Sequence, residues 1–339
     1  MARVQLSAEF GAQGRMSCDP IVDAAQRLLN GEAIGFPTET VYGLGADAAN
    51  ADAVAKIFAL KGRPADHPLI VHFADPVALD EWAIEIPEAA RVLAKHFWPG
   101  ALTMILKKSS RVPGAVTGGQ DTVGLRCPSH PMAQELLREF ARIGSGAVAA
   151  PSANRFGHVS PTTAAHVREE FGPDLMVLDG GECEIGLEST IIDLSRGTPV
   201  MLRPGGISRE EIARVLGHAP RDRDAQAPRA SGTLEAHYAP RTPLLIVDAT
   251  ALEEELRMHA NSAVLAFNDP PSGVHAATWI TTSADPLAYG HDLYANLRQL
   301  DDIGAQRILV QEPPSGPEWE AVNDRLERAA AGTVASEEA

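Results

Sequence analysis

Two cations flank a single glycine in the segment Lys61-Gly62-Arg63-Pro64, directly after a predicted helix. A glycine lets the backbone approach a ligand closely while both charged side chains reach the same group, an arrangement that suits phosphate. The alternative is a solvated helix end, where the helix dipole favours cations. The spacing by itself leaves both interpretations open.

Short hydrogen-bonding side chains follow two predicted strands. Ser152 and Asn154 come after the small-residue strand 147–150, and Thr38 follows the strand 33–37. Ligands in open α/β sheets bind at the carboxyl ends of strands, which would place these side chains in a crevice. They would serve equally well as caps of local turns, because Ser, Thr and Asn bond nearby backbone groups.

Two arginines end predicted strands: Arg126 closes 122–126, and Arg203 precedes a Pro-Gly-Gly turn. An arginine there could hold a carboxylate or phosphate through two parallel N–H bonds. For Arg126 the residues alone favour a structural salt bridge, since arginine pairs readily in proteins. The aromatic pair His237-Tyr238 lies in a polar, Pro-containing segment, either as the anchor of a lid over a site or pinned to the surface.

Several common catalytic signatures are missing from the sequence. It has no GxxxxGK[ST], HExxH or GxSxG motif, and Gly43-Leu-Gly45 lacks the third glycine of a dinucleotide fingerprint. Cys127 has no identifiable base beside it, so a buried, inert thiol is expected. The three cysteines have no CxxC or metal-ligand spacing and fit a reducing cytosol; they are Cys18, Cys127 and Cys183.

The composition predicts a soluble chain with more than one domain. The 339 residues are 45% hydrophobic and 22% charged, which excludes a largely disordered protein. The formal net charge of −16 should repel nucleic acid and anionic membranes, so any RNA connection is expected to be indirect. No signal peptide and no apolar run of about 20 residues is visible, and a cytoplasmic location is expected.

The apolar spacing of the first part predicts a mixed α/β sheet rather than a regular βαβ array. Helices are expected at 20–29, 50–60, 87–97, 131–142, 161–171 and 208–217, the last opened by the capping box Ser208-Arg-Glu-Glu211. Strands are expected at 33–37, 69–73, 101–106, 122–126, 147–150 and 175–178, with a hairpin of 189–194 and 199–202.

The chain divides into five segments on this pattern. We expect a flexible leader at 1–18, a first domain at 19–217, a linker or lid at 218–243, a small α/β domain at 244–332 and an acidic tail at 333–339. In the small domain, strands are expected at 244–247, 263–267 and 308–310, and helices at 287–300 and 319–331.

Several segments together resemble the YrdC-like domain in family order from about residue 20 to 217. They are Gly35–Gly45, Lys61–Pro64, Pro68–His72, Trp98-Pro99-Gly100 with Leu102-Thr103, Pro151–Asn154, Glu188–Ile192 and Leu202–Gly205. The linker ending in His237-Tyr238-Ala239-Pro240 and the small domain resemble the long, two-domain form of the threonylcarbamoyl-AMP synthase family. The resemblance implies a mixed twisted sheet with flanking helices and a smaller Rossmann-like C-terminal domain.

The resemblance also implies an activity. L-threonine, bicarbonate or CO2, and ATP, with Mg2+ accompanying the nucleotide, would give threonylcarbamoyl-AMP and pyrophosphate. A separate transferase complex would then modify adenosine 37 of tRNAs that read ANN codons. Direct tRNA binding by this chain would be weak or absent, in agreement with its acidity.

Carried over residue by residue, the resemblance assigns Lys61 and Arg63 as catalytic residues. The ATP-binding set would be Lys61, Arg63, Thr122, Ser152, Asn154, Ser160, Arg203 and Tyr238, with His237 as an alternative to Tyr238. The threonine-binding set would be Thr38, His72, Arg126, Ala150 and Ser189. No side chain is assigned to a metal, and residues 219–243 are expected to cover the site and to order with nucleotide.

Three other interpretations of the sequence compete with the synthase. An RNA-binding YrdC-like module without adenylate formation is disfavoured by the net charge. A carbamoyl transferase of the hydrogenase-maturation kind is disfavoured because paired CxxC motifs are missing. A short-form relative is disfavoured by the second domain.

Overall fold

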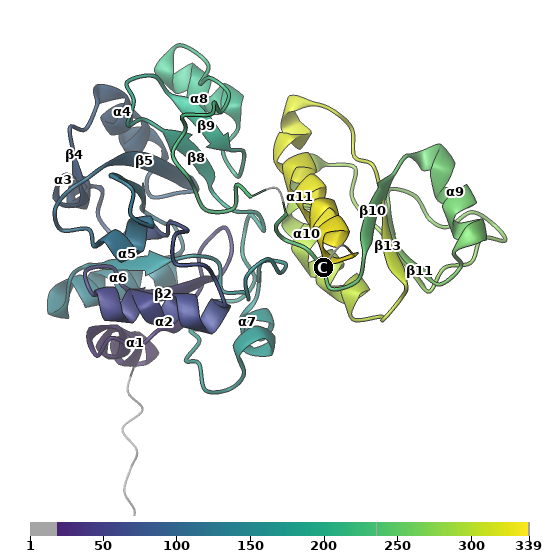
Figure 1. Cartoon of the computed structure of the whole chain (residues 1–339), viewed down its shortest axis with the longest axis horizontal. Coiled ribbons are helices and arrows are strands. Elements are labelled where there is room, and N and C mark those ends of the chain that lie inside the picture. Colours follow the sequence, from purple (N-terminus) through teal and green to yellow (C-terminus); the bar gives the residue numbers. More distant parts are fainter. Residues whose placement is uncertain (1–18, 235, 338–339) are drawn as a thin grey trace, which may run out of the picture.

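The computed structural model describes residues 19–234 and 236–337, so the predicted leader at 1–18 lies outside the described residues. The chain forms two lobes, each built around its own β-sheet (Figure 1). The first lobe holds a nine-stranded sheet and the second a four-stranded sheet. The predicted mixed α/β fold with a smaller second α/β domain is confirmed.

The sheet of the first lobe is mixed in direction. Its strands are β1 (Ile34–Phe36), β2 (Gly43–Asp47), β3 (Ile70–Phe73), β4 (Ala83–Ile84), β5 (Leu102–Lys108), β6 (Thr122–Arg126), β7 (Ala147–Ala150), β8 (Thr190–Asp193) and β9 (Val200–Arg203). Their order is β1-β2-β7-β3-β6-β5-β8-β9, with β4 beside β5. The pairs β3–β6 and β5–β8 are parallel, whereas the remaining neighbours are antiparallel.

Helices flank this sheet, and several begin where the sequence supplies a cap. They are α1 (Pro20–Leu29), α2 (Ala51–Lys61), α3 (Leu79–Trp82), α4 (Glu88–Phe97), α5 (Gly114–Thr117), α6 (Pro131–Ile143), α7 (Ala164–Phe171) and α8 (Arg209–Leu216). Asp19 accepts a hydrogen bond from the N–H of Ile21 at the start of α1. Ser208 and Glu211 form the predicted capping box of α8.

The strand predicted at 175–178 is wrong in extent. Only one bridge forms there, between Val177 and Gly35 of the edge strand β1. Its two hydrogen bonds run from the N–H of Gly35 to the carbonyl of Met176 and from the N–H of Leu178 to the carbonyl of Gly35. The apolar side chains are nevertheless buried or half-buried against the sheet, which explains why the pattern looked like a strand.

The helix predicted from residue 161 begins later, at Ala164. Thr163 caps it by accepting a hydrogen bond from the N–H of His166, while the carbonyl of Pro161 accepts one from the N–H of Tyr42. Pro161 therefore lies before the helix and bonds to the residue that precedes β2, instead of opening α7.

The second lobe is a parallel α/β unit. Its strands are β10 (Leu244–Val247), β11 (Ser262–Ala266), β12 (Thr278–Thr281) and β13 (Arg307–Gln311), in the order β10-β13-β11-β12. Its helices are α9 (Ala249–Met258), α10 (Pro286–Asp301) and α11 (Glu320–Glu337). Helix α9 and strand β12 were not predicted from the sequence, and α11 continues into the residues assigned to the acidic tail.

Helices α10 and α11 of the second lobe face the first lobe (Figure 1). Tyr289 and Tyr294 of α10 share one apolar cluster with Val159 and Leu187 of the first lobe and with Tyr238 of the linker. The two lobes are thus joined by a common core, which fixes α10 and α11 close to the ends of the first sheet. Among the described residues, no helix is both long and apolar enough to cross a membrane.

Candidate active site

A cavity of about 40 Å³ lies where several strand ends of the first sheet meet the linker. The predicted site residues that line it are Thr38, His72, Arg126, Ala150, Ser152, Ser189, Arg203 and Tyr238. The linker contributes Ser231, Gly232 and His237 to the same wall as Tyr238. The sheet therefore forms one side of the cavity, and the linker covers the other.

Lys61 and Arg63 lie beside the cavity at the end of α2. Gly62 ends the helix in the left-handed conformation, at φ 64°, which turns the chain between the two cations. Both side chains are buried, at 3% and 7% exposure, so the solvated-helix-end alternative is wrong. Burial, and secondly the charge of Arg63, lower the pKa of Lys61 well below its usual value.

The loop after β7 holds Lys61 in place. The Nζ of Lys61 donates to the carbonyl oxygen of Ser152 at 2.6 Å and to that of Asn154. The amide of Asn154 donates to the carbonyls of Arg155 and His158, as the capped-turn alternative expects. Its Oδ1, however, is buried and accepts no hydrogen bond, which a local cap does not explain.

Arg203 connects the sheet to the linker. Its Nε and Nη2 donate to the carbonyl oxygen of Ser189 at 3.2 and 2.8 Å, and its Nη1 donates to the carbonyl oxygen of Ser231 at 2.9 Å. The hydroxyl of Ser189 shares a 2.8 Å hydrogen bond with that of Thr103 on β5. Arg63 reaches the same linker residue, with its Nη2 3.4 Å from the Ser231 hydroxyl.

A buried ion pair forms the far end of the cavity. Arg126 donates from Nη2 to Oε1 of Glu39 at 2.7 Å, and Oε2 of Glu39 accepts from the N–H of Ser129. The salt bridge favoured by the sequence is therefore present, yet Arg126 also lines the cavity. Burial and the charge of Arg126 lower the pKa of His72 to about 3, so its ring is neutral at pH 7.

The linker packs its aromatic pair into the site. His237 and Tyr238 lie edge to face with ring centroids 4.1 Å apart, and both are buried. A Cβ on Gly232 would lie 2.1 Å from the Tyr238 oxygen and 2.7 Å from Nη1 of Arg203. Gly232, at φ +70°, is therefore required by both its conformation and this close approach.

Unsatisfied polar atoms gather around this cavity. Of the buried side-chain atoms without a hydrogen-bond partner in the described part of the chain, four lie here: Arg63 Nε, Asn154 Oδ1, His237 Nδ1 and Tyr238 OH. Native proteins satisfy nearly all such groups, and each buried group that lacks a hydrogen bond costs about 1–3 kcal/mol. Donors and acceptors concentrated in one place are those that an incoming polar ligand can satisfy.

Glu188 links the cavity to the second lobe. Its Oε1 accepts a 2.6 Å hydrogen bond from the Ser160 hydroxyl, and its Oε2 accepts from Tyr294 of α10 at 2.9 Å and from Nε of Arg325 of α11 at 2.8 Å. Burial raises the pKa of Glu188, but the charges of Arg325 and Arg203 and the hydrogen bonds outweigh it and lower the pKa to about 2. A carboxylate of the first lobe is thus held ionised by the second.

Two family models match the chain. Residues 26–205 match Sua5_yciO_yrdC, described as Telomere recombination, and residues 207–331 match the family described as Threonylcarbamoyl-AMP synthase, C-terminal domain. A threonylcarbamoyl-AMP synthase of Pyrococcus abyssi is 40% identical over 320 residues, which cover 90% of this chain and 92% of that protein. The chain belongs to the threonylcarbamoyl-AMP synthase family.

Other members of this family are similar over most of the chain. A threonylcarbamoyl-AMP synthase of Bacillus subtilis is 40% identical over 334 residues, covering 93% of this chain and 94% of that one. The crystal structure of P. abyssi Sua5 complexed with L-threonine superposes with a TM-score of 0.85 at 38% identity, covering 92% and 94% of the two chains. The two-domain form is therefore confirmed over a short-form relative.

Three residues of the predicted ATP set are buried close to the cavity without lining it: Lys61, Arg63 and Asn154. Ser160 is buried behind Glu188. Thr122, at the opposite end of β6 from Arg126, lies apart in a separate small cavity beneath Ala230 and Ser231 of the linker.

Sequence reasoning missed residues that complete the site. Glu39 and Glu188 lie inside quoted motifs but were given no role, whereas Ser231, Tyr294 and Arg325 belong to no local motif. A signal existed for the two glutamates, because Glu39 stands between two threonines after a strand and Glu188 directly precedes Ser189 at the start of another. No short-range signal points to Tyr294 or Arg325, which meet Glu188 across 106 and 137 residues.

The expected inert thiol is confirmed. Cys127 is buried, its Sγ lies 3.2 Å from the carbonyl oxygen of Ala74, and burial raises its pKa to about 11. Within residues 19–234 and 236–337, no group of three or more His, Cys, Asp or Glu side chains is placed to hold a metal ion.

Proposed function

We propose that this chain forms threonylcarbamoyl-AMP and pyrophosphate from L-threonine, bicarbonate or CO2, and ATP. The observation that carries the proposal is the cluster of Lys61, Arg63 and Arg203. All three are buried, and their hydrogen bonds go to carbonyl and hydroxyl oxygens, with no carboxylate in ion-pair contact in the described part of the chain. A triphosphate supplies the missing negative charge. Family membership and the activity named for the relatives support the proposal.

The triphosphate lies against Lys61 and Arg63 in this proposal. These cations balance the charge that builds up on the leaving pyrophosphate, and the buried site makes that interaction stronger than in water. The unsatisfied Nε of Arg63 and the Nδ1 of His237 meet phosphate or nucleoside groups. Ser152, Asn154, Ser160, Arg203 and Tyr238 bind the nucleotide around them, and Thr122 is reached where the linker moves away.

L-threonine binds at the opposite end of the cavity. Arg126 is fixed by Glu39 through Nη2, which leaves Nη1 to hold the threonine carboxylate. Thr38, Ala150 and Ser189 shape the pocket around the side chain. The neutral ring of His72 adds a polar group without adding a second charge.

The reaction requires no protein nucleophile. The threonine amine forms a bond to the carbon of CO2 and loses a proton, which gives a carbamate. A carbamate oxygen then attacks the α-phosphorus, and the bond between that phosphorus and the pyrophosphate oxygen breaks. Cys127, the cysteine nearest in sequence to Arg126, is buried with a raised pKa and takes no part. Catalysis rests on alignment of the reactants and on charge stabilisation.

We propose that magnesium enters with ATP. The two carboxylates at the cavity, Glu39 and Glu188, are already engaged by Arg126 and Arg325. The donor set therefore suits an ion held mainly by phosphate oxygens and water, as Mg2+ commonly is. The ion supplies further neutralisation of the phosphates.

The linker acts as a lid in this proposal. A cavity of about 40 Å³ is far smaller than the roughly 300–1,000 Å³ of ordinary ligand sites, so ATP and threonine cannot enter without movement. Residues 219–243 then close over the bound substrates, order with nucleotide and exclude water from a labile product. Equal protease sensitivity of this segment with and without ATP plus threonine would contradict the lid.

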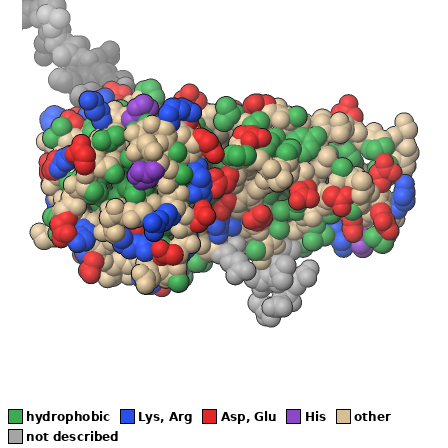
Figure 2. All heavy atoms as spheres, turned by 90° about the horizontal axis from the view of Figure 1, so that it is seen from above, with side chains coloured by type: hydrophobic (Ala, Val, Ile, Leu, Met, Phe, Trp, Pro, Cys, Tyr) green, Lys and Arg blue, Asp and Glu red, His purple; other side chains and the backbone are tan. Residues whose placement is uncertain are grey.

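We also propose that the product is consumed by a separate tRNA-modifying transferase complex in the cytoplasm. On the face shown in Figure 2, basic side chains are interspersed with acidic ones. Together with the net charge of −16, this pattern gives nucleic acid little electrostatic attraction, so direct tRNA binding is weak or absent. The RNA-binding module without adenylate formation is disfavoured on the same grounds.

Carbon labelling tests the proposal directly. Purified chain, ATP, Mg2+ and L-threonine are incubated with [14C]bicarbonate, and the products are separated rapidly by chromatography. We expect the label in an adenylate that does not form when L-threonine is omitted and that falls by about 100- to 1,000-fold when Lys61→Met replaces the wild type. Consumption of ATP to AMP or ADP with no label in an adenylate would contradict the proposal.

A further inference from the structure

The loop that carries Ser152 and Asn154 determines where the Lys61 ammonium lies. Besides the two hydrogen bonds from Nζ, the N–H of Phe156 donates to the carbonyl oxygen of Lys61 at 2.9 Å. The Asn154 amide closes the same loop by bonding two of its carbonyls. Displacement of residues 152–159 would therefore move the ammonium with them.

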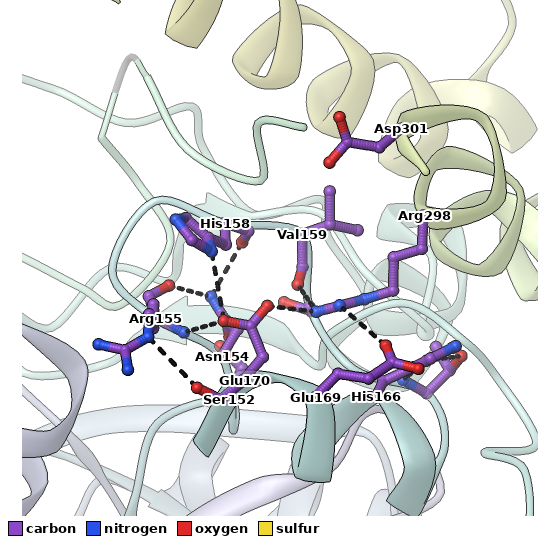
Figure 3. A network of polar contacts seen from close by, with 12 residues as sticks. Ser152, Asn154, Arg155, His158, Val159, His166, Glu169, Glu170, Arg298 and Asp301 are labelled. Atoms are coloured by element: carbon purple, nitrogen blue, oxygen red, sulfur yellow. Dashed lines mark hydrogen bonds and ion pairs between the residues drawn. The ribbon is translucent and has the colours of Figure 1, made fainter. Parts of the chain in front are cut away.

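Glu170 of α7 anchors the outer side of this loop. Its Oε2 accepts hydrogen bonds from the N–H of Arg155 at 3.0 Å and from Nδ1 of His158 at 3.2 Å. Its backbone carbonyl accepts a third bond, from Nε of Arg155 at 3.2 Å. The carboxylate itself is 7% exposed, and Figure 3 shows it lying between the loop and α10.

Arg298 brings the second lobe into the same network. From α10 its Nη2 donates to Oε1 of Glu170 at 2.9 Å and to the carbonyl oxygen of Val159 at 2.5 Å (Figure 3). One guanidinium therefore holds both the anchor and the last residue of the loop. Burial raises the pKa of Glu170, but the hydrogen bonds from His158 and Arg155 and the charge of Arg298 lower it to about 2.

We propose that Arg298 and Glu170 are positioning residues for Lys61, through which the second lobe sets the geometry of the phosphate site. This inference rests on the proposed function, because it assigns the two residues to the binding and alignment of ATP. It also gives the second lobe a specific part in the reaction: one arginine of α10 holds the loop that holds the cation.

The contacts explain why the effect should be on ATP rather than on threonine. Arg298 is linked to Lys61 through Glu170 and the loop 152–159. Arg126, at the threonine end, is held instead by Glu39, which lies in the segment between β1 and β2. A misplacement of about 1 Å in an active site can lower the rate by about 100-fold. We therefore expect loss of the pair to lower kcat/KM for ATP by about 10- to 100-fold and to leave the KM for threonine within about twofold.

Steady-state pyrophosphate release measures this split in the full chain. The variants are Arg298→Gln and Glu170→Gln, singly and together, with Arg298→Lys as the conservative change. Arg257→Gln is the matched control, because Arg257 pairs only with Glu253 on its own exposed helix face in the described structure. We expect Arg298→Gln to lose at least as much as Glu170→Gln, because it also removes the bond to Val159, and the double variant to lose no more than Arg298→Gln. Arg298→Lys should retain more activity than Arg298→Gln, and the control should match wild type.

Hydrogen exchange supplies a readout that does not depend on activity. Peptides covering residues 152–159 should exchange at least about tenfold faster in Arg298→Gln than in wild type, while peptides of β10 and β13 stay unchanged. If Arg298→Gln does not fold, Glu170→Gln and Arg298→Lys give the same two measurements. Unchanged loop exchange with unchanged kcat/KM for ATP would overturn the inference, as would independent, multiplying losses in the double variant. Faster loop exchange in a chain whose wild type releases no pyrophosphate would instead contradict the proposed function alone.

Discussion

Replacing Glu188 with glutamine should destabilise the chain by about 3 kcal/mol. The change keeps the size and one acceptor oxygen but removes the charge that Arg325 faces. Arg325 is 1% exposed, so its guanidinium would be left buried with the neighbouring Asp324 as its remaining acidic contact. The effect should reach beyond the active site, because Arg325 belongs to the second lobe and Glu188 to the first.

The magnitude follows from the structure in two ways. The pKa of Glu188 falls from 4.5 to about 2 in the folded chain. Each pKa unit corresponds to about 1.4 kcal/mol between the charged and neutral forms, so a neutral side chain of the same shape forfeits about 3 kcal/mol. Removal of one partner from a buried ion pair typically costs about 3–5 kcal/mol, which agrees.

Equilibrium unfolding in urea at pH 7, followed by tryptophan fluorescence, measures this loss. Trp82 and Trp98 report on the first lobe, and Trp279 and Trp319 on the second. A loss of about 3 kcal/mol should also lower the melting temperature by about 4 °C, since an unfolding entropy of about 2.1 cal/mol/K per residue gives about 0.7 kcal/mol/K for 339 residues.

The matched control is Glu253→Gln, which removes an exposed carboxylate paired with Arg257 at i,i+4. Such a pair contributes about 0.3–0.5 kcal/mol, so the control should unfold almost as wild type does. A Glu188→Gln variant no less stable than this control would refute the reasoning that the two lobes are joined through an ionised carboxylate.

Three further changes follow from the same geometry. Lys61→Met should lower adenylate formation by about 100- to 1,000-fold, and a turnover near wild type would contradict its role. The melting temperature should fall by no more than a few degrees, because a buried ammonium lacking a carboxylate partner adds little stability. Gly232→Ala should increase protease cleavage in 219–243 and AMP release into solution, because its Cβ would collide with Tyr238; unchanged digestion would show that the closed linker tolerates it. The lowered pKa values of Glu170 and Glu188 predict a contribution to stability that is complete above about pH 4.5 and is lost as the pH falls towards 2. In acid titrations followed by fluorescence, the stability of a Glu170→Gln/Glu188→Gln variant should depend less steeply on pH than that of wild type. An identical pH dependence would contradict the assignment.

Local rules predicted much of the fold because the relevant interactions are local. The first helix has its cap at Asp19, and the helix at 209–216 has a reciprocal capping box that can be recognised in four residues. The strand β2 was missed because Gly-Leu-Gly-Ala-Asp has few residues typical of strands. It forms nonetheless because it pairs with β1 on one side and β7 on the other.

The site was only partly predictable for the same reason. Lys61 and Arg63 are two positions apart, with only Gly62 between them, so their convergence is visible in the sequence. The partners that complete the site come from distant elements: Glu170 meets Arg298 across 128 residues, and Glu188 meets Arg325 across 137. No periodicity or motif encodes which buried arginine faces which carboxylate, because that depends on how the second lobe packs against the first.

Pyrophosphate release from ATP, with L-threonine and bicarbonate omitted in turn, tests the central claim most directly. The account predicts release that requires both, because the carbamate of threonine is the group that attacks the α-phosphorus. Release that continues without threonine, or no release from a folded chain supplied with all substrates, would contradict it.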